Sequence, residues 1–479
     1  MSPLEKDLLE AIPAPSARIL LIGEELLRHR PLWEMRNPLV AIDTTSGPWS
    51  GTHAADPKPA AAILDIDELD RDAAAAAGWA AANLPPTGTL ALLTRRPGND
   101  AAMQSLATML EQHGLTAERK TGGTPHAIWR FLQRDAVRPP LHITGHLLAA
   151  DSGLLSTSVV RVRILEPFEQ LGSLPGVRCS QWTGLQDPPP AGDPAAANIL
   201  VVQRKIFLKP ELYLQPAHAR HFITVAEFGD LLLDSGFTPE RYKSNLAGFH
   251  AVQASTPALA DFLRQFNPEV GIFGNHLPRI RPLRKKTDQP VRVLFAAIGR
   301  QTAWREIVQS CKSVLASYGD KVATTVVGDR EFFDQLQPLN SQFRPVLAYP
   351  DYLAELEQSH IAILPLADTQ FDRCKTDLKF IECAESGTAV LASRVVYGQT
   401  VRPGDTGFLY HQPDEFRRHL RKLIEDTPMR EKMATKAHRY VSQKRALANH
   451  VRRQYEWYLS LVERREELDR QLKRRLGQS

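Results

Sequence analysis

Cysteine is scarce in this chain: only four of 479 residues, scattered at Cys179, Cys311, Cys374 and Cys383. Their spacing matches no zinc-binding pattern, so the sequence predicts no metal site. So few cysteines also exclude a disulfide-stapled secreted scaffold and indicate a reducing compartment.

Long apolar runs are absent as well. No stretch of about 18 apolar residues occurs, so we expect no membrane-spanning helix. The first residues, Met1–Asp7, lack a basic region followed by an apolar one, which argues against a secretory signal. With 43% hydrophobic and 24% charged residues, the chain is predicted to be a soluble cytoplasmic protein of about three domains.

A strong overall charge is also lacking. The net charge is +5, and Arg430–Arg475 holds 14 Lys or Arg against 6 Asp or Glu, a surplus of 8. The rest of the chain is therefore about −3 (5 minus 8). A globally basic nucleic-acid-binding protein is not indicated, and the basic C-terminus is a local feature.

Residues 1–135 are predicted to form a small α/β unit. Its buried parallel strands are expected at the apolar runs Ile19–Gly23, Leu39–Asp43, Ala61–Leu64 and Leu90–Thr94. Ala-rich helical segments lie between them, including Arg71–Ala82 and Ala101–His113.

The order of these pieces resembles a class I methyltransferase that uses S-adenosylmethionine. The matching segments are Ala17–Gly23, Val40–Asp43, Leu84–Leu90 and Met109–Leu115. After Gly23, however, the chain continues Glu24-Glu25-Leu26-Leu27, where that family has further glycines that let the backbone approach the cofactor. We therefore expect a degenerate, non-catalytic domain that serves packing or partner binding; the alternative is a functional variant.

Two further α/β units are expected at residues 140–278 and 291–440, joined by the basic, Pro-marked connector Leu277–Pro290. The second unit starts near Leu141–His146, and its strands are predicted at Val159–Ile164, Asn198–Arg204 and Phe222–Val225. His250–Pro257 is predicted to be a further strand and turn, and Gly271–Asn275 closes the unit. Strands of the third unit are predicted at Val291–Ile298, Val322–Gly328, Ile361–Leu366 and Ala389–Ala392. Two successive α/β units enclose a cleft, a common place for a ligand.

The segment Lys375–Ser393 carries the most specific chemistry. Thr376 can cap a helix that Gly387 ends before the next strand. Lys375 and Arg373 at the mouth of this helix suit a phosphate, and Glu382 can accept hydrogen bonds from ligand hydroxyls.

The second and third units together resemble GT-B glycosyltransferases of the bacterial group-1 (family 4-like) type, over roughly Leu141–Tyr458. Those enzymes carry an E-x7-E motif, here represented by Glu382 and followed by Gly387–Ala392, and Arg402–Leu409 matches their later glycine-rich loop. Supporting matches upstream are Arg163 with Pro167 and Leu171, Gln203-Arg204, and Val252–Thr256.

This chain departs from that pattern in two places. Cys374 stands eight residues before Glu382, where the first acid belongs. The acceptor-side segment Val225–Asp230 keeps only Glu227 and Asp230 as acids.

The resemblance implies transfer of a sugar from a nucleotide-sugar to a saccharide or lipid-linked acceptor, in assembly of a bacterial cell-surface polysaccharide such as lipopolysaccharide. No metal or other cofactor is expected, because a convincing Asp-x-Asp pair is missing. A non-catalytic scaffold is the alternative, and an active methyltransferase fused to a transferase is a third reading.

Cationic groups must then neutralise the leaving diphosphate. Gly299-Arg300 follows the first strand of the third unit, the position at which related enzymes place such a pair, and Arg305 is a second candidate. The donor-side set is Gly299, Arg300, Arg305, Arg373, Lys375, Thr376 and Glu382, with Lys379, Asp329 and Arg330 as weaker candidates.

On the acceptor side, Glu227, Asp230, His250 and Asn275 are candidates. A general base is needed if the reaction inverts configuration, and the sequence does not choose among them. We name Arg300, Lys375, Glu227 and His250 as the catalytic set.

The C-terminal residues 441–479 are predicted to be helical. By resemblance, a final helix returns to the second unit up to about Leu461, and the charged run Glu463–Arg475 is expected to be solvated. Its basic character leaves peripheral contact with anionic lipid at the inner membrane face as a hypothesis.

Overall fold

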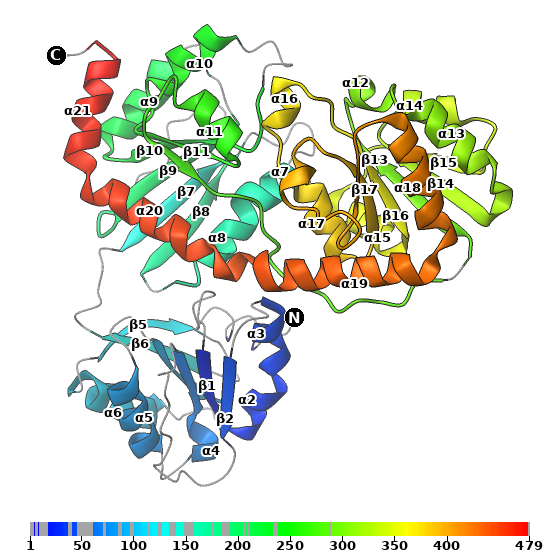
Figure 1. Cartoon of the computed structure of the whole chain (residues 1–479). Coiled ribbons are helices and arrows are strands. Elements are labelled where there is room, and N and C mark those ends of the chain that lie inside the picture. Colours follow the sequence, from blue (N-terminus) through cyan, green and yellow to red (C-terminus); the bar gives the residue numbers. More distant parts are fainter. Residues whose placement is uncertain are drawn as a thin grey trace.

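The computed structural model describes most of the chain after residue 140 and a smaller share before it. The described residues are 4, 8, 18–36, 41–45, 61–69, 73–84, 89–95, 100–112, 115–121, 127–133, 140–147, 158–174, 176–183, 192–204, 207, 210–232, 238–287 and 289–477. They form three six-stranded sheets, one after another along the sequence (Figure 1). We refer to each sheet with its helices as the first, second and third unit.

The first unit has the strand order β2-β1-β3-β4-β6-β5. Its parallel strands are β1 (Arg18–Ile22), β2 (Ala41–Thr45), β3 (Ala61–Asp65) and β4 (Thr89–Thr94), and β6 (Ala127–Gln133) runs antiparallel to β4 and β5 (Leu115–Thr121). The helices are α2 (Glu24–Arg28), α3 (Arg30–Arg36), α4 (Ile66–Leu69), α5 (Ala73–Asn83) and α6 (Asp100–Gln112). All four strands predicted from apolar runs are present, and Glu24 begins α2 directly after Gly23. The methyltransferase resemblance stays a prediction.

The second unit is an all-parallel sheet with the order β8-β7-β9-β10-β11-β12. Its strands are β7 (Leu141–His146), β8 (Val177–Trp182), β9 (Ala197–Gln203), β10 (Ile223–Phe228), β11 (Ala251–Ala254) and β12 (Val270–Ile272). Its helices are α8 (Glu166–Leu171), α9 (Pro210–Ala219), α10 (Pro239–Leu246) and α11 (Pro257–Leu263). The apolar strands are buried on both faces, as a parallel sheet between helices requires.

One predicted strand of this unit is wrong. Val159–Ile164 lies in the short helix α7 (Ser158–Val160) and the π-helical turn Arg161–Leu165. The alternation of Val and Arg in this stretch is typical of a strand. Instead Arg163 points inward to the buried Glu227, and the helical turn buries Val162, Arg163 and Ile164 together.

The third unit has the order β15-β14-β13-β16-β17-β18, all parallel. Its strands are β13 (Val291–Ala296), β14 (Val322–Val327), β15 (Ser341–Arg344), β16 (Ile361–Leu364), β17 (Ala389–Ser393) and β18 (Phe408–Tyr410). Its helices are α12 (Gln301–Trp304), α13 (Val308–Ala316), α14 (Arg330–Leu336), α15 (Tyr349–Gln358), α16 (Gln370–Arg373), α17 (Leu378–Glu385) and α18 (Pro413–Glu425). This is the 3-2-1-4-5-6 Rossmann order, whose ligand crevice lies at the carboxyl ends of β13 and β16, where the order reverses.

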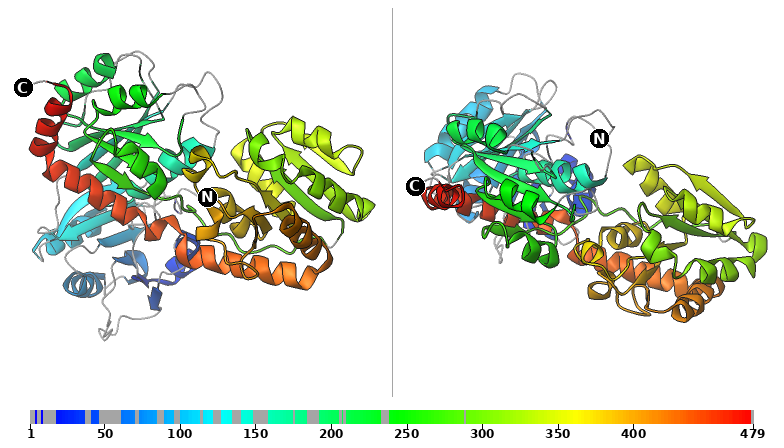
Figure 2. Two further views of the ribbon diagram at one scale, coloured as in Figure 1. Left: turned by 45° about the horizontal axis from the view of Figure 1, so that its top comes forward. Right: turned by 90° about the horizontal axis from the view of Figure 1, so that it is seen from above.

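The C-terminal helices connect the third unit back to the second. Helix α19 (Thr427–Lys444) packs on the third unit, and α20 (Val451–Glu463) and α21 (Arg465–Arg475) lie along the second (Figures 1 and 2). The two crossings between the units run side by side, because Leu277 N donates to Arg445 O (2.8 Å) and Leu447 N donates to Leu277 O (2.8 Å). The α/β prediction of two Rossmann-like units with a returning helix, the GT-B architecture, is confirmed.

The predicted solvated run Glu463–Arg475 is wrong. Leu468 and Leu472 of α21 are buried, and Arg475 Nη2 donates to Phe249 O (2.7 Å). The apolar face of this helix consists of only two leucines, one turn apart, and the many charged residues around them obscured it in the sequence. None of the helices in the described part of the chain is long and apolar enough to cross a membrane.

Candidate functional site

The carboxyl edges of the second and third sheets meet each other through side chains that follow the strands. After β11, Thr256 Oγ1 donates to Cys374 O (3.1 Å). After β12, Asn275 Nδ2 donates to Thr376 Oγ1 (2.9 Å). The polar residues at both edges therefore form one continuous site, at the place where ligands of open α/β sheets bind.

Three cations and two acids form the centre of this site. Arg300 Nη1 donates to Asp372 Oδ1 (3.1 Å), Lys375 Nζ lies 3.7 Å from Asp230 Oδ2, and Arg204 Nη2 lies 3.4 Å from Asp230 Oδ1. We call these five residues the cation cluster. The cluster draws Arg300, Asp372 and Lys375 from the third unit and Arg204 and Asp230 from the second. The cluster has one more positive than negative charge, so it can bind an anion.

Lys375 of the cluster packs against the aromatic ring of Phe371. Its ammonium group lies 3.9 Å from the centre of the Phe371 ring. The pKa of Lys375 is lowered to about 8, chiefly by burial and also by the charge of Arg300, while Asp230 opposes the shift. An anion bound here would favour the charged lysine.

Asp372 fixes the orientation of Arg300. Its Oδ2 accepts from Ala367 N (2.8 Å) while Oδ1 holds the guanidinium. Thr369 caps the short helix α16 by accepting from Asp372 N (3.1 Å). Gly299, directly before Arg300, has φ 63°, a left-handed conformation that favours glycine and turns the chain out of the strand.

Glu382 of α17 belongs to a second, buried polar group. It is 2% exposed, and it accepts hydrogen bonds from Tyr349 Oη (2.9 Å) and Tyr352 Oη (3.1 Å) on α15. Burial raises the pKa of Glu382 to about 7, against the opposing charge of Lys379. The ammonium of Lys379 sits 4.9 Å from the centre of the Tyr352 ring.

The second unit contributes another acid to this region. Burial raises the pKa of Glu166 to about 7; Arg161 opposes the shift and the charge of Glu382 adds to it. Arg161 Nε lies 3.5 Å from Glu166 Oε1, and its guanidinium lies 5.8 Å from the centre of the Tyr349 ring. Two carboxyl groups from different units therefore share one buried environment.

The beginning of α17 differs from the prediction by one residue. Asp377, not Thr376, occupies the cap position, and both its oxygens are held by Arg445 (2.6 and 2.8 Å). Thr376 still accepts a bond from Leu378 N (3.3 Å), an N–H that the helix leaves free. Gly387 follows the helix end with φ 67°, as predicted.

Cys374, at the position of the first family acid, is a packing residue here. Its side chain is 2% exposed and lies in the apolar cluster of the second unit. Burial raises the pKa of its thiol. Cys374 therefore contributes an apolar contact between the third and second units and no charge.

Several predicted donor-side residues lie outside the cation cluster. Arg305 and Arg373 are mostly exposed and pair with Glu331 and Asp368 of their own unit (3.0 and 2.6 Å). Asp329 caps α14 by accepting from Phe332 N and also accepts from Trp304 Nε1 (2.9 and 2.8 Å), and the exposed Arg330 pairs with Asp334 (2.9 Å).

Two of the four residues named as catalytic have structural partners. Glu227 is fully buried and its Oε1 accepts from Arg163 Nε (2.7 Å); Arg163 Nη1 also donates to Asn275 Oδ1 (2.9 Å). His250 lies at the amino end of β11, the edge opposite the site, where its Nε2 is 3.0 Å from Asp469 Oδ1. Arg300 and Lys375 are the two that the fold brings together.

The site also contains residues that the sequence did not single out for chemistry: Arg204, Asp372, Tyr349, Tyr352, Arg161 and Glu166. A usable signal existed for Arg204, which directly follows a buried strand, and for the tyrosines, which lie three residues apart on a helix. Glu166 and Asp372 carried no such signal. Among the described residues, no group of three or more His, Cys, Asp or Glu side chains could hold a metal ion.

One family model matches most of the third unit and part of the helices that follow it. Residues 300–456 match the family described as "Glycosyl transferase-like". The matched stretch begins at Arg300 and includes Asp372 and Lys375, so it contains the third unit's share of the cation cluster. No curated protein matches the chain.

Solved structures similar to the chain share little sequence with it. Anabaena HepE, in a complex with UDP and glucose, has a TM-score of 0.47 at 15% identity, covering 67% of this chain and 99% of HepE. A glycosyltransferase of Rickettsia africae has a TM-score of 0.46 at 13% identity, covering 67% and 98%. TarM of S. aureus has a TM-score of 0.41 at 14% identity, and this chain spans 55% of its length.

Proposed function

We propose that this protein is a glycosyltransferase that takes its sugar from a nucleotide-sugar donor. The observation that carries the proposal is the cation cluster, which lies at the carboxyl edge of a glycosyl transferase-like unit. Breaking the bond between sugar and diphosphate leaves negative charge on the diphosphate. Arg300, Lys375 and Arg204 are positioned to neutralise it, and groups fixed in advance stabilise such charge most effectively.

The cluster can exchange its present partners for phosphate oxygens. Asp230 and Asp372 form ion pairs with the three cations, and a diphosphate carries more negative charge than either carboxylate. In this proposal Asp372 keeps Arg300 oriented, and Lys375 turns from Asp230 to the donor. Glu382 accepts hydroxyl hydrogen bonds from the nucleotide ribose in place of those from Tyr349 and Tyr352.

A non-catalytic scaffold is the second candidate. The buried Cys374 favours it, because a thiol packed among apolar residues cannot do what the first acid of the family motif does. The two candidates make different predictions for donor binding.

A donor screen separates them. Calorimetry of the full chain against UDP-, GDP- and dTDP-sugars, with detection of released nucleoside diphosphate, should show binding and turnover for one nucleotide class. Binding without release in the presence of any saccharide acceptor would favour the scaffold. The absence of binding to the whole panel would reject the transferase proposal.

We further propose a saccharide or lipid-linked acceptor and a role in cell-surface polysaccharide assembly on the cytoplasmic side of the membrane. We also propose that the chain is divided into four parts, residues 1–135, 140–278, 291–440 and 441–479, of which the first serves packing or partner binding.

Contact of the basic C-terminus with lipid is a further part of the proposal. Arg464, Arg465 and Arg475 bond to the second unit, so a lipid contact would have to use the remaining cations. Sedimentation with anionic vesicles, compared with a variant lacking residues 463–479, tests that contact.

A further inference from the structure

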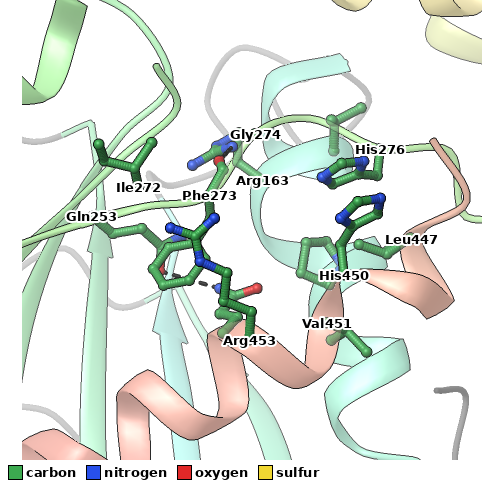
Figure 3. A pocket seen from close by; sticks show the side chains of 13 residues that line it. Arg163, Gln253, Ile272, Phe273, Gly274, His276, Leu447, His450, Val451 and Arg453 are labelled. Carbon is green, nitrogen blue, oxygen red and sulfur yellow. Dashed lines mark hydrogen bonds between the residues drawn. The ribbon is translucent and has the colours of Figure 1, made fainter. Parts of the chain in front are cut away.

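A small cavity lies beside the two crossings between the second and third units. It has a volume of about 50 Å³ and lies between the end of β12, the turn that carries Arg163, and the beginning of α20 (Figure 3). His276 of the first crossing and Leu447 of the second both line it. We call it the hinge cavity; it is distinct from the cation cluster.

The side chains that line the hinge cavity are rich in nitrogen and carry no carboxylate. The polar ones are Arg163, Gln253, His276, His450, Arg453 and Gln454. The others are apolar or glycine. A cation therefore finds no anionic ligand here, whereas an anion finds two guanidinium groups and two imidazoles.

Two of these side chains have a buried nitrogen without a partner among the described residues. Arg163 is 4% exposed; Glu227 takes its Nε, while its Nη2 has no hydrogen-bond partner among the described residues, and neither has the neighbouring Glu227 Oε2. His276 Nδ1 is also buried and without a partner in the described part of the chain. Buried nitrogens of this kind are usually satisfied by a bound group or by water.

The two imidazole rings are stacked, with centroids 3.6 Å apart and planes within 7°. Figure 3 shows them one above the other, with the Arg453 side chain projecting from α20 between the rings and the strand ends. Burial lowers the pKa of His276 and of His450, and the charge of His450 lowers the pKa of His276 further. Within the described residues, no hydrogen bond or ion pair holds the Arg453 side chain.

We propose that the hinge cavity binds a free oxyanion of phosphate size, held by Arg453, Arg163 Nη2 and His276. A volume of about 50 Å³ is too small to enclose a nucleotide or a sugar, and water is the competing occupant. An anion here links His276, at the start of the first crossing, to Arg453 on α20, the helix that follows the second crossing. This site does not depend on the proposed transferase activity.

The test uses the full chain with ¹⁵N-labelled histidine, titrated with inorganic phosphate against chloride at equal ionic strength. We expect saturable binding to one site and a rise in the pKa of His276 and His450. Arg453→Gln should weaken phosphate binding about tenfold or more, since it removes a charge-assisted bond. Arg452→Gln, an exposed neighbour that does not line the cavity, should leave it unchanged.

The control for the other anion site is Arg300→Gln. If phosphate binding is lost in Arg300→Gln but kept in Arg453→Gln, phosphate occupies the cation cluster and the proposal is overturned. An effect that does not saturate, or one that is equal in all variants, means that water fills the hinge cavity, and this too overturns it.

Discussion

Replacing Glu227 by glutamine should destabilise the second unit rather than act only on turnover. The change keeps the shape of the side chain but removes its charge, so that Arg163, 4% exposed, is left as an uncompensated buried cation. Breaking a buried pair in this way costs about 3–5 kcal/mol. Because Arg163 also holds Phe273 O and Asn275, the loss should spread along β10 and β12.

Hydrogen exchange of the native full chain measures this loss locally, since exchange reports the free energy of opening for each segment. Amides of β10 should exchange faster in Glu227→Gln. Asp261→Asn removes an exposed acid that pairs with Arg264 in the same unit, and it should stay within about 0.5 kcal/mol. Unchanged exchange in Glu227→Gln together with abolished sugar transfer would show that Glu227 is a reacting base and would refute the structural assignment.

Three further predictions concern the donor site, the C-terminal helix and the buried acid. Lys375→Met should weaken nucleotide-sugar binding about tenfold or more in calorimetry, and equal affinities in variant and wild type would contradict this. Leu468→Ala in α21 should cost about 2–5 kcal/mol by urea unfolding, whereas exposed Lys473→Ala should change little; equal effects would mean that α21 is not docked. Because the folded pKa of Glu382 is raised from 4.5 to about 7, its protonation stabilises the fold below about pH 4.5 and that contribution, about 3 kcal/mol, is lost as pH rises to 7. Glu382→Gln should therefore flatten the fall in stability between pH 4.5 and 7, and an unaltered slope would disprove the assignment.

The fold was largely predictable because its buried strands are short apolar runs bounded by polar turns. The strands Val291–Ala296 and Ala389–Ser393 are examples, because they begin at the same residues as the predicted runs Val291–Ile298 and Ala389–Ala392. The pattern failed at Arg161–Leu165, where a buried ion pair, invisible in local sequence, fixes a helical turn. It failed again at Arg465–Arg475, where two buried leucines dock the helix although most of its nine other residues are charged.

The location of a site residue could be predicted where its place next to a strand or helix determines it. Arg300 follows a central strand and Lys375 precedes a helix, so both had to lie at the carboxyl edge. The roles of Glu227 and His250 depended on partners 64 and 219 residues away, Arg163 and Asp469. Sequence spacing carries no information about such partners, and the catalytic roles of Glu227 and His250 stay predictions.

The most direct test of the central claim compares two arginines of the third unit for donor binding. Calorimetry with the nucleotide-sugar that binds the wild type best should show affinity reduced about tenfold or more in Arg300→Gln, which lies in the cation cluster. Arg305→Gln, exposed and paired with Glu331, should bind as the wild type does. Equal affinities in all three proteins, or a loss confined to Arg305→Gln, would contradict the assignment of the cation cluster as the diphosphate site.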